Sequence, residues 1–188
     1  SDAICEELEL EAVPVAAAAS HDTQSALIAV PAKEDDFIFL SCGTWSLLGT
    51  ELKEPIINAK SEKYNITNEG GHEGTISFLK NIIGLWLIQE SRRQWIREGE
   101  EYGFGELESM AKGVTKLQSF IDPDASEFGT QGNIPRRIRA YCERTGQKIP
   151  DTIGAVVRCI NESLALKYRM ALEEIEDCTG KNYDTIYM

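Results

Sequence analysis

Short apolar runs in the first half of the chain predict β-strands. Residues 37–41 and 45–52 are rich in β-branched, aromatic and aliphatic residues and are separated by Gly43-Thr44. This arrangement is typical of a hairpin with a tight turn. A further strand is predicted at residues 64–67. These segments predict a sheet that begins near residue 37.

Apolar positions recur every three or four residues in the second half, which predicts helices. The longest helix is predicted at residues 151–179, closed by Gly180. Another opens at Asn133, with Pro135 just inside it, and runs to residue 144. Further helices are predicted at residues 4–11, 25–29, 75–95 and 106–112. The helix at 75–95 is apolar on most of its faces and is therefore expected to be buried on more than one side.

Strands and helices together predict a single α/β domain. Residues 184–188 resemble the opening of another strand that stops without a partner or a turn. We therefore expect a domain that is incomplete at its C-terminal end. The sequence carries no signal for an oligomeric state.

The charge balance argues against polyanionic partners. The chain of 188 residues has 31 acidic and 19 basic residues and a formal charge of -12. Such a chain is a poor candidate for binding nucleic acid or an anionic membrane surface. The longest apolar run, at residues 82–88, is far shorter than the roughly 20 residues that a membrane span needs. No secretory signal pattern opens the sequence, so a cytoplasmic location is expected.

The cysteines and histidines predict no metal site. The five cysteines are scattered and form no C-x-x-C pair, which favours buried free thiols. Cys142 and Cys159 lie on predicted helices near a common turn, so a disulfide between them stays open. The two histidines are too few for a metal site built on them.

Two short motifs are candidates for chemistry. His21-Asp22-Thr23 follows the apolar run at residues 13–19, which suits a buried strand, and precedes helical sequence. α/β proteins place catalytic groups at such strand-to-helix edges, although an aspartate there is also a common helix cap. Gly43-Thr44 could offer backbone N–H groups and a hydroxyl to a phosphate, or could be an ordinary turn. Neither motif decides the function by itself.

The ordered set of motifs resembles the second domain of the FGGY carbohydrate kinases. The matching segments are Ala-Ser-His-Asp-Thr at 19–23, Leu-Ser-Cys-Gly-Thr-Trp-Ser-Leu-Leu-Gly-Thr-Glu at 40–51, Asn-Ile-Thr-Asn-Glu-Gly-Gly at 65–71 and Phe-Leu-Lys-Asn-Ile-Ile-Gly-Leu-Trp-Leu-Ile-Gln-Glu at 78–90. The resemblance continues through Phe-Ile-Asp-Pro-Asp at 120–124 and Cys-Ile-Asn-Glu-Ser-Leu-Ala-Leu-Lys-Tyr at 159–168, so it covers essentially the whole chain.

The resemblance implies a ribonuclease-H-like domain of the actin, Hsp70 and sugar kinase type, in which a mixed sheet is flanked by helices. It also implies that ATP, with Mg²⁺, and a sugar are the substrates. It gives Asp22 the role of catalytic base. It places His21, Thr23 and Asn81 with Asp22 beside the sugar, and Gly43, Thr44 and Gln89 beside ATP. Asn81 could instead be a structural amide, and Gln89 an ordinary exposed helix residue. Glu69 could face the cleft or be a solvated loop carboxylate.

The sequence also departs from the family pattern. The family's first domain, with its phosphate loop, and the glycine turn that holds adenosine are absent, so residues 1–188 match a truncated second domain. The missing first domain is therefore the expected partner in cis, and we expect no kinase turnover from this chain alone. Cys42 stands where serine is common in the family's phosphate turn, a change expected to be tolerated. The runs at 43–51 and 80–86 favour L-rhamnulose as the sugar; xylulose, glycerol or fuculose, or a non-catalytic sugar-binding domain, stay open.

Overall fold

The computed structural model describes residues 2–11, 14, 21–34 and 36–188. Its strands are β1 (Ile38–Cys42), β2 (Trp45–Leu52), β3 (Thr67–Gly70), β4 (Ile76–Ile83) and β5 (Ile186–Tyr187). Its α-helices are α1 (Asp2–Glu7), α2 (Asp22–Ile28), α3 (Ala59–Lys63), α4 (Trp86–Arg97), α5 (Phe104–Lys112), α6 (Ile134–Arg144) and α7 (Ile153–Thr179). Two short 3₁₀ turns lie at η1 (His72–Gly74) and η2 (Ser126–Phe128).

The strands form one mixed sheet in the order β3-β4-β2-β1-β5. β1 and β2 make the predicted antiparallel hairpin, and Cys42 pairs with Ser46 at its closed end. β4 lies antiparallel between β2 and β3. β5 runs parallel to β1, with Ile186 opposite Ile38, so the last predicted strand does have a partner. The sheet and its flanking helices confirm the predicted α/β class.

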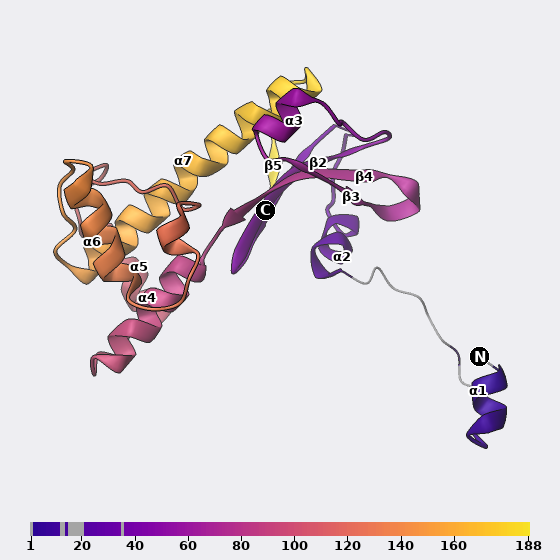
Figure 1. Ribbon diagram of the computed structural model, residues 1–188, viewed down its shortest axis with the longest axis horizontal. Coiled ribbons are helices and arrows are strands. Elements are labelled where there is room, and N and C mark those ends of the chain that lie inside the picture. The colour runs from indigo at the N-terminus through magenta and orange to yellow at the C-terminus, as the bar shows by residue number, and fades with distance from the viewer. Residues whose placement is uncertain (1, 12–13, 15–20, 35) are drawn as a thin grey trace.

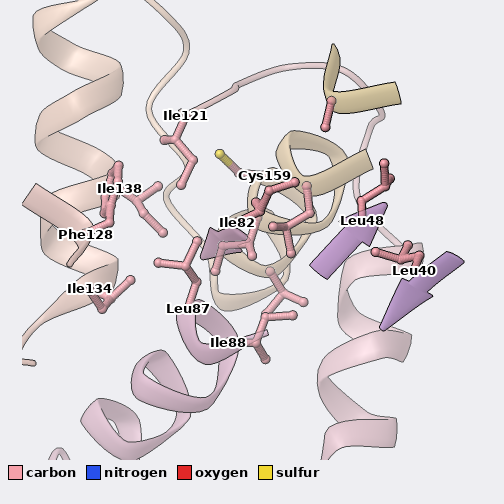
Figure 2. Packing of buried hydrophobic residues seen from close by; sticks show 14 of the residues in the cluster. Leu40, Leu48, Ile82, Leu87, Ile88, Ile121, Phe128, Ile134, Ile138 and Cys159 are labelled. Atoms are coloured by element: carbon pink, nitrogen blue, oxygen red, sulfur yellow. The ribbon is translucent and has the colours of Figure 1, made fainter. Parts of the chain in front are cut away.

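Each face of the sheet carries its own apolar cluster, because successive side chains of a strand point to opposite faces. The smaller cluster packs against α2 and contains Leu27, Phe37, Phe39, Leu47 and Leu79. The larger cluster lies on the face that α7 crosses and continues among the other helices (Figure 1). Figure 2 shows Leu48 and Ile82 of the sheet within the same cluster as Leu87 and Cys159. α7 thus joins the sheet to the helical part of the domain.

The two long C-terminal helices follow their sequence signals. The side chain of Asn133 accepts the N–H of Arg136 at 3.0 Å and caps α6. Thr152 accepts the N–H of Ala155 at 3.1 Å and caps α7. Gly180 ends α7 in the left-handed conformation, with φ of 69°, where a side chain would be strained. Both predictions are confirmed to within two residues at each end.

The helix predicted at residues 75–95 is wrong in its first half. Residues 76–83 form β4, and only from Trp86 does the chain become the helix α4. A run that is apolar on every side suits a strand buried on both faces as well as a buried helix, and local sequence does not separate the two. The sheet decides between them, because β4 pairs along its whole length with β2 and along part of it with β3.

The strand predicted at residues 64–67 begins three residues later, at Thr67. Residues 59–63, before this segment, form the short helix α3, which was not predicted. Asn58 caps it, accepting the N–H groups of Lys60 and Ser61 at 2.9 and 3.0 Å. Asn65, with φ of 52°, then redirects the chain into the strand.

The N-terminal predictions are only partly covered by the structure. The helix expected at residues 4–11 is the shorter α1, which has no buried residue. The strand expected at residues 13–19 lies, apart from Pro14, outside the described residues. Within the described part of the chain, no helix has the length and apolar character needed to cross a membrane.

Candidate functional site

A hollow of about 510 Å³ opens on the α2 face of the sheet. Its lining comes from the start of α2, the hairpin turn and three strands: His21, Asp22, Thr23, Thr44, Trp45, Leu47, Glu69 and Asn81. The structure therefore brings together all four residues predicted to lie beside the sugar and one predicted to lie beside ATP. Glu69, whose orientation was left open, also lines it.

Strand register explains why distant residues share this face. Leu47 of β2 lies directly opposite Asn81 of β4. Trp45 is two residues before Leu47, so its side chain points to the same face. Asn81 is an exposed strand residue, not an interruption of a helix as the sequence analysis held. Its correct surroundings follow only once residues 76–83 are placed in the sheet.

Asp22 is the first residue of α2, and His21 precedes it with extended backbone angles. Its carboxylate oxygen Oδ1 accepts the N–H of Thr23 at 2.7 Å and lies 3.7 Å from Nε2 of His21. The side chain is nevertheless 96% exposed. The carboxylate thus bonds the adjacent backbone N–H without capping the helix, because the N-cap position is His21 and no side chain caps it, and it stays open to the hollow.

The start of α2 is fixed to the sheet just behind Asp22. Thr23 and Gln24 are buried, and Oε1 of Gln24 accepts the hydroxyl of Ser77 on β4 at 2.9 Å. Nε2 of Gln24 is buried without a hydrogen-bond partner among the described residues. Leu27, one turn later, enters the small apolar cluster. These contacts give the Asp22 backbone a defined position relative to β4.

The Gly43-Thr44 turn is joined to the start of α4. The N–H groups of Gly84 and Trp86 donate to the Thr44 carbonyl at 3.2 and 3.1 Å, and that of Leu85 donates to the Gly43 carbonyl at 3.0 Å. The N–H of Gly43 itself donates to the Trp45 carbonyl at 2.9 Å. Because this last bond occupies the Gly43 amide, the turn offers a ligand chiefly the Thr44 side of its backbone and the Thr44 hydroxyl.

Glycine permits a close approach at this turn at Gly84 but is not required by any protein contact at Gly43. A Cβ on Gly43 would meet nothing nearer than the Trp45 carbonyl, at the ordinary contact distance of 3.5 Å. A Cβ on Gly84 would lie 2.5 Å from Oγ of Ser46 and 2.8 Å from the Gly43 carbonyl oxygen. Gly84 therefore allows α4 to start directly against the turn. This close contact was not predicted from the sequence, because Gly84 falls inside a segment predicted as one continuous helix.

Gln89 lies on α4, one turn after the junction, and its Oε1 accepts the Thr44 hydroxyl at 3.4 Å. Gln89 and Gly43 do not line the hollow. The predicted ATP-binding residues thus gather around the turn and the predicted sugar-binding residues around the hollow, with Thr44 common to both. Trp45, 57% exposed, and Leu47 add an apolar wall that the sequence analysis did not single out.

The described residues contain no group of three or more His, Cys, Asp or Glu side chains able to hold a metal ion. The thiols of Cys142 and Cys159 are free and buried. Asp22 and Glu69 place two carboxylates in the hollow with His21 beside one of them. Such a site can accept a proton from a neutral polyol and hydrogen-bond its hydroxyls.

Comparisons with known proteins agree on one family. Residues 38–188 match the model of the FGGY family of carbohydrate kinases, C-terminal domain. The chain is 44% identical over 179 residues to rhamnulokinase from Bacteroides thetaiotaomicron and 41% identical over 180 residues to rhamnulokinase from Bacillus subtilis. These matches cover 95% and 96% of the chain but only 36% of each relative. The chain thus spans about a third of the length of the curated relatives it matches.

A solved structure supports the fold. The crystal structure of xylulose kinase from Bifidobacterium adolescentis superposes with a TM-score of 0.53 and 16% identity, covering 88% of this chain and 31% of that one. The similarity concerns the architecture, and it confirms the expected ribonuclease-H-like domain of the sugar kinase type.

Proposed function

Because the chain belongs to the FGGY family of carbohydrate kinases, we propose that it is the C-terminal part of an enzyme that transfers the γ-phosphoryl group of ATP to a sugar hydroxyl. The observation that carries this proposal is the hollow, where Asp22, Thr44 and Asn81 meet from three separate elements. The expected remainder of the protein is an N-terminal domain that closes over this face. The full-length protein is this chain together with that N-terminal domain.

Asp22 is the proposed catalytic base. Its exposed carboxylate accepts the proton of the sugar hydroxyl, the hydroxyl oxygen forms a bond to the γ-phosphorus, and the bond from that phosphorus to the β,γ-bridging oxygen breaks to release ADP. A positioned base contributes about 10²–10⁴ to such a rate. His21, Thr23 and Asn81 line the same hollow and are proposed to orient the sugar.

The Gly43-Thr44 turn is the proposed phosphate contact. Thr44 lines the hollow beside Asp22, and Gln89 holds its hydroxyl from the α4 side. A threonine at this position can therefore reach a phosphoryl group that is placed over the sugar. Mg²⁺, carried by ATP, would neutralise the developing phosphate charge. No step depends on a metal ligand from the described residues.

We further propose L-rhamnulose, phosphorylated at its 1-hydroxyl, as the sugar. A relative named rhamnulokinase, 44% identical over 95% of the chain, supports this choice. Because that match covers nearly the whole chain, it takes in the segment around Asp22. The apolar wall of Trp45 and Leu47 also suits a deoxysugar, whose methyl group needs no hydrogen-bond partner.

A substrate panel on the full-length protein tests the choice of sugar. Initial rates with ATP are compared for L-rhamnulose, L-fuculose, D-xylulose and glycerol. We expect the highest kcat/KM with L-rhamnulose. A higher kcat/KM with another of these compounds would overturn the substrate and keep the enzyme class, and no sugar-dependent ADP release with any of them would count against kinase activity itself.

A further inference from the structure

The long helix α7 contacts the turn end of the Gly43-Thr44 hairpin through the hydroxyl of one partly buried tyrosine. The Tyr168 hydroxyl shares a hydrogen bond with Oγ of Ser46 at 2.7 Å and lies 3.7 Å from Sγ of Cys42. Cys42 and Ser46 are the paired residues on either side of the turn. A single side chain of α7 therefore touches both strands where they enter the turn.

This contact is partly shielded from water. Ser46 is fully buried and Tyr168 is partly buried, and burial raises the pKa of the Tyr168 hydroxyl to about 12. The hydroxyl therefore keeps its proton at neutral pH and can donate to Ser46 or accept from it. Hydrogen bonds screened from water hold geometry better than exposed ones.

The neighbouring residue of α7 reaches the other side of the same junction. Nζ of Lys167 lies 2.8 Å from Oδ1 of Asp122 and 3.0 Å from Oδ2 of Asp124. The other oxygen of Asp124 accepts the N–H of Ile83 at 2.8 Å. Ile83 ends β4 and directly precedes Gly84, whose N–H bonds to the turn. Lys167 is thus linked to the turn through Asp124 and two backbone groups.

We propose that Tyr168 and Lys167 are positioning residues that hold the Gly43-Thr44 turn in place for phosphoryl transfer. The proposal rests on the proposed function, in which this turn contacts the phosphate of ATP. Phosphoryl transfer depends on alignment, and a displacement of about 1 Å can cost about 10²-fold in rate. Neither side chain lines the hollow, so each acts through the turn and not on the sugar.

Kinetics of the full-length protein test the positioning role of Tyr168. Tyr168→Phe and Ser46→Ala each remove one partner of the hydrogen bond at little change in volume. We expect either variant to lower kcat/KM for ATP about threefold to tenfold, the worth of one hydrogen bond, while KM for the sugar stays within twofold. The double variant should be no worse than the more affected single variant, because both lose the same bond.

Tyr64→Phe is the matched control. The Tyr64 hydroxyl also bonds to α7, at 3.0 Å from Oδ2 of Asp177, but near the far end of the helix. Its loss should leave both KM values and kcat unchanged. If Tyr168→Phe behaves like Tyr64→Phe, or if it changes the sugar KM and the ATP KM equally, Tyr168 merely anchors α7 and the proposal fails.

Variants of Asp124 test the positioning role of Lys167. Asp124→Asn keeps a carbonyl oxygen for the Ile83 N–H but loses the ion pair, whereas Asp124→Ala loses both. Because the backbone bond connects to the turn, we expect Asp124→Ala to reduce kcat/KM for ATP more than Asp124→Asn. Lys167→Met, which loses the ion pairs to both Asp122 and Asp124, should reduce it at least as much as Asp124→Asn. If Asp124→Ala is as active as the unmodified protein, Lys167 does not position the turn through Asp124.

Hydrogen exchange separates the proposal from the proposed function. The amides of residues 84–86 donate to the turn, and their exchange can be measured in the full-length protein without substrates. Tyr168→Phe should accelerate their exchange at least threefold, and Tyr64→Phe should not. Unchanged exchange would refute the positioning role even in an active kinase, whereas faster exchange in a protein without kinase activity would refute only the function.

Discussion

Single residues at the hollow combine a local structural contact with an exposed functional group. Asp22 binds the N–H of Thr23 and still has an almost fully exposed carboxylate. A helix cap and a catalytic base were open alternatives for this residue. The structure places Asp22 inside α2, after the N-cap position at His21, and leaves its carboxylate exposed to the hollow. Asn81 lines the hollow although its predicted helix is a strand, because the motif that identified it does not depend on local structure.

Thr44 should behave as a side chain that contacts phosphate. In the full-length protein we expect Thr44→Ala to lower kcat/KM for ATP about tenfold, because the variant loses one hydrogen bond from the protein to the anionic phosphate. Thr44→Ser keeps the hydroxyl and should stay within threefold of the unmodified protein. Steady-state rates at varied ATP and saturating sugar measure this. A Thr44→Ser variant as impaired as Thr44→Ala would point instead to a packing role for the methyl group.

At the scale of elements, the strength of local signals decided what could be predicted. The β1–β2 hairpin, α6 and α7 carry turn and cap residues that act over a few positions, and the sequence analysis predicted them closely. β4 carries no such signal, because its conformation is fixed by pairing with β2 and β3. The role of Gly84 follows from the place where β4 ends, so it was missed together with the strand.

Gly84 should tolerate no side chain. A Cβ there would press on Ser46 and on the Gly43 carbonyl, so we expect Gly84→Ala to lower the free energy of unfolding by about 1–3 kcal/mol. Gly105→Ala is the control, because a Cβ on Gly105, inside α5, would meet nothing within 4 Å. It should be neutral or stabilise by about 0.5–1 kcal/mol. Urea unfolding of both variants measures the difference, and equal stabilities would contradict the tight junction.

At the scale of the whole molecule, α7 joins the sheet to the helical part through buried side chains, among them the Cys159 thiol. Burial raises the pKa of this thiol from 9.0 to about 12. Between these values the unfolded chain has lost a proton that the folded chain keeps. The free energy of unfolding is therefore unaffected below about pH 9 and falls as the pH rises toward 12.

Alkaline unfolding under reducing conditions tests this linkage. From pH 9 to pH 10.5 the Cys159 thiol should account for a loss of about 1.6 kcal/mol in the free energy of unfolding. Cys159→Ala should be less stable at pH 8, because it leaves a small cavity, but should lose less stability over this pH interval. Urea unfolding at both pH values gives the comparison. Parallel losses in the two proteins would show that Cys159 does not contribute.

The central claim, that Asp22 is the base of a sugar kinase, is tested most directly by the turnover of Asp22→Asn in the full-length protein. Asparagine can still accept the Thr23 N–H but cannot take a proton from the sugar. Asp151→Asn, just before the Thr152 cap of α7 and outside the hollow, is the matched control. We predict that kcat with L-rhamnulose falls about 10²–10⁴-fold for Asp22→Asn only, with the sugar KM and the unfolding midpoint retained. A kcat within threefold of the unmodified protein would contradict the claim and leave Asp22 as a first-turn residue of α2 without a catalytic role.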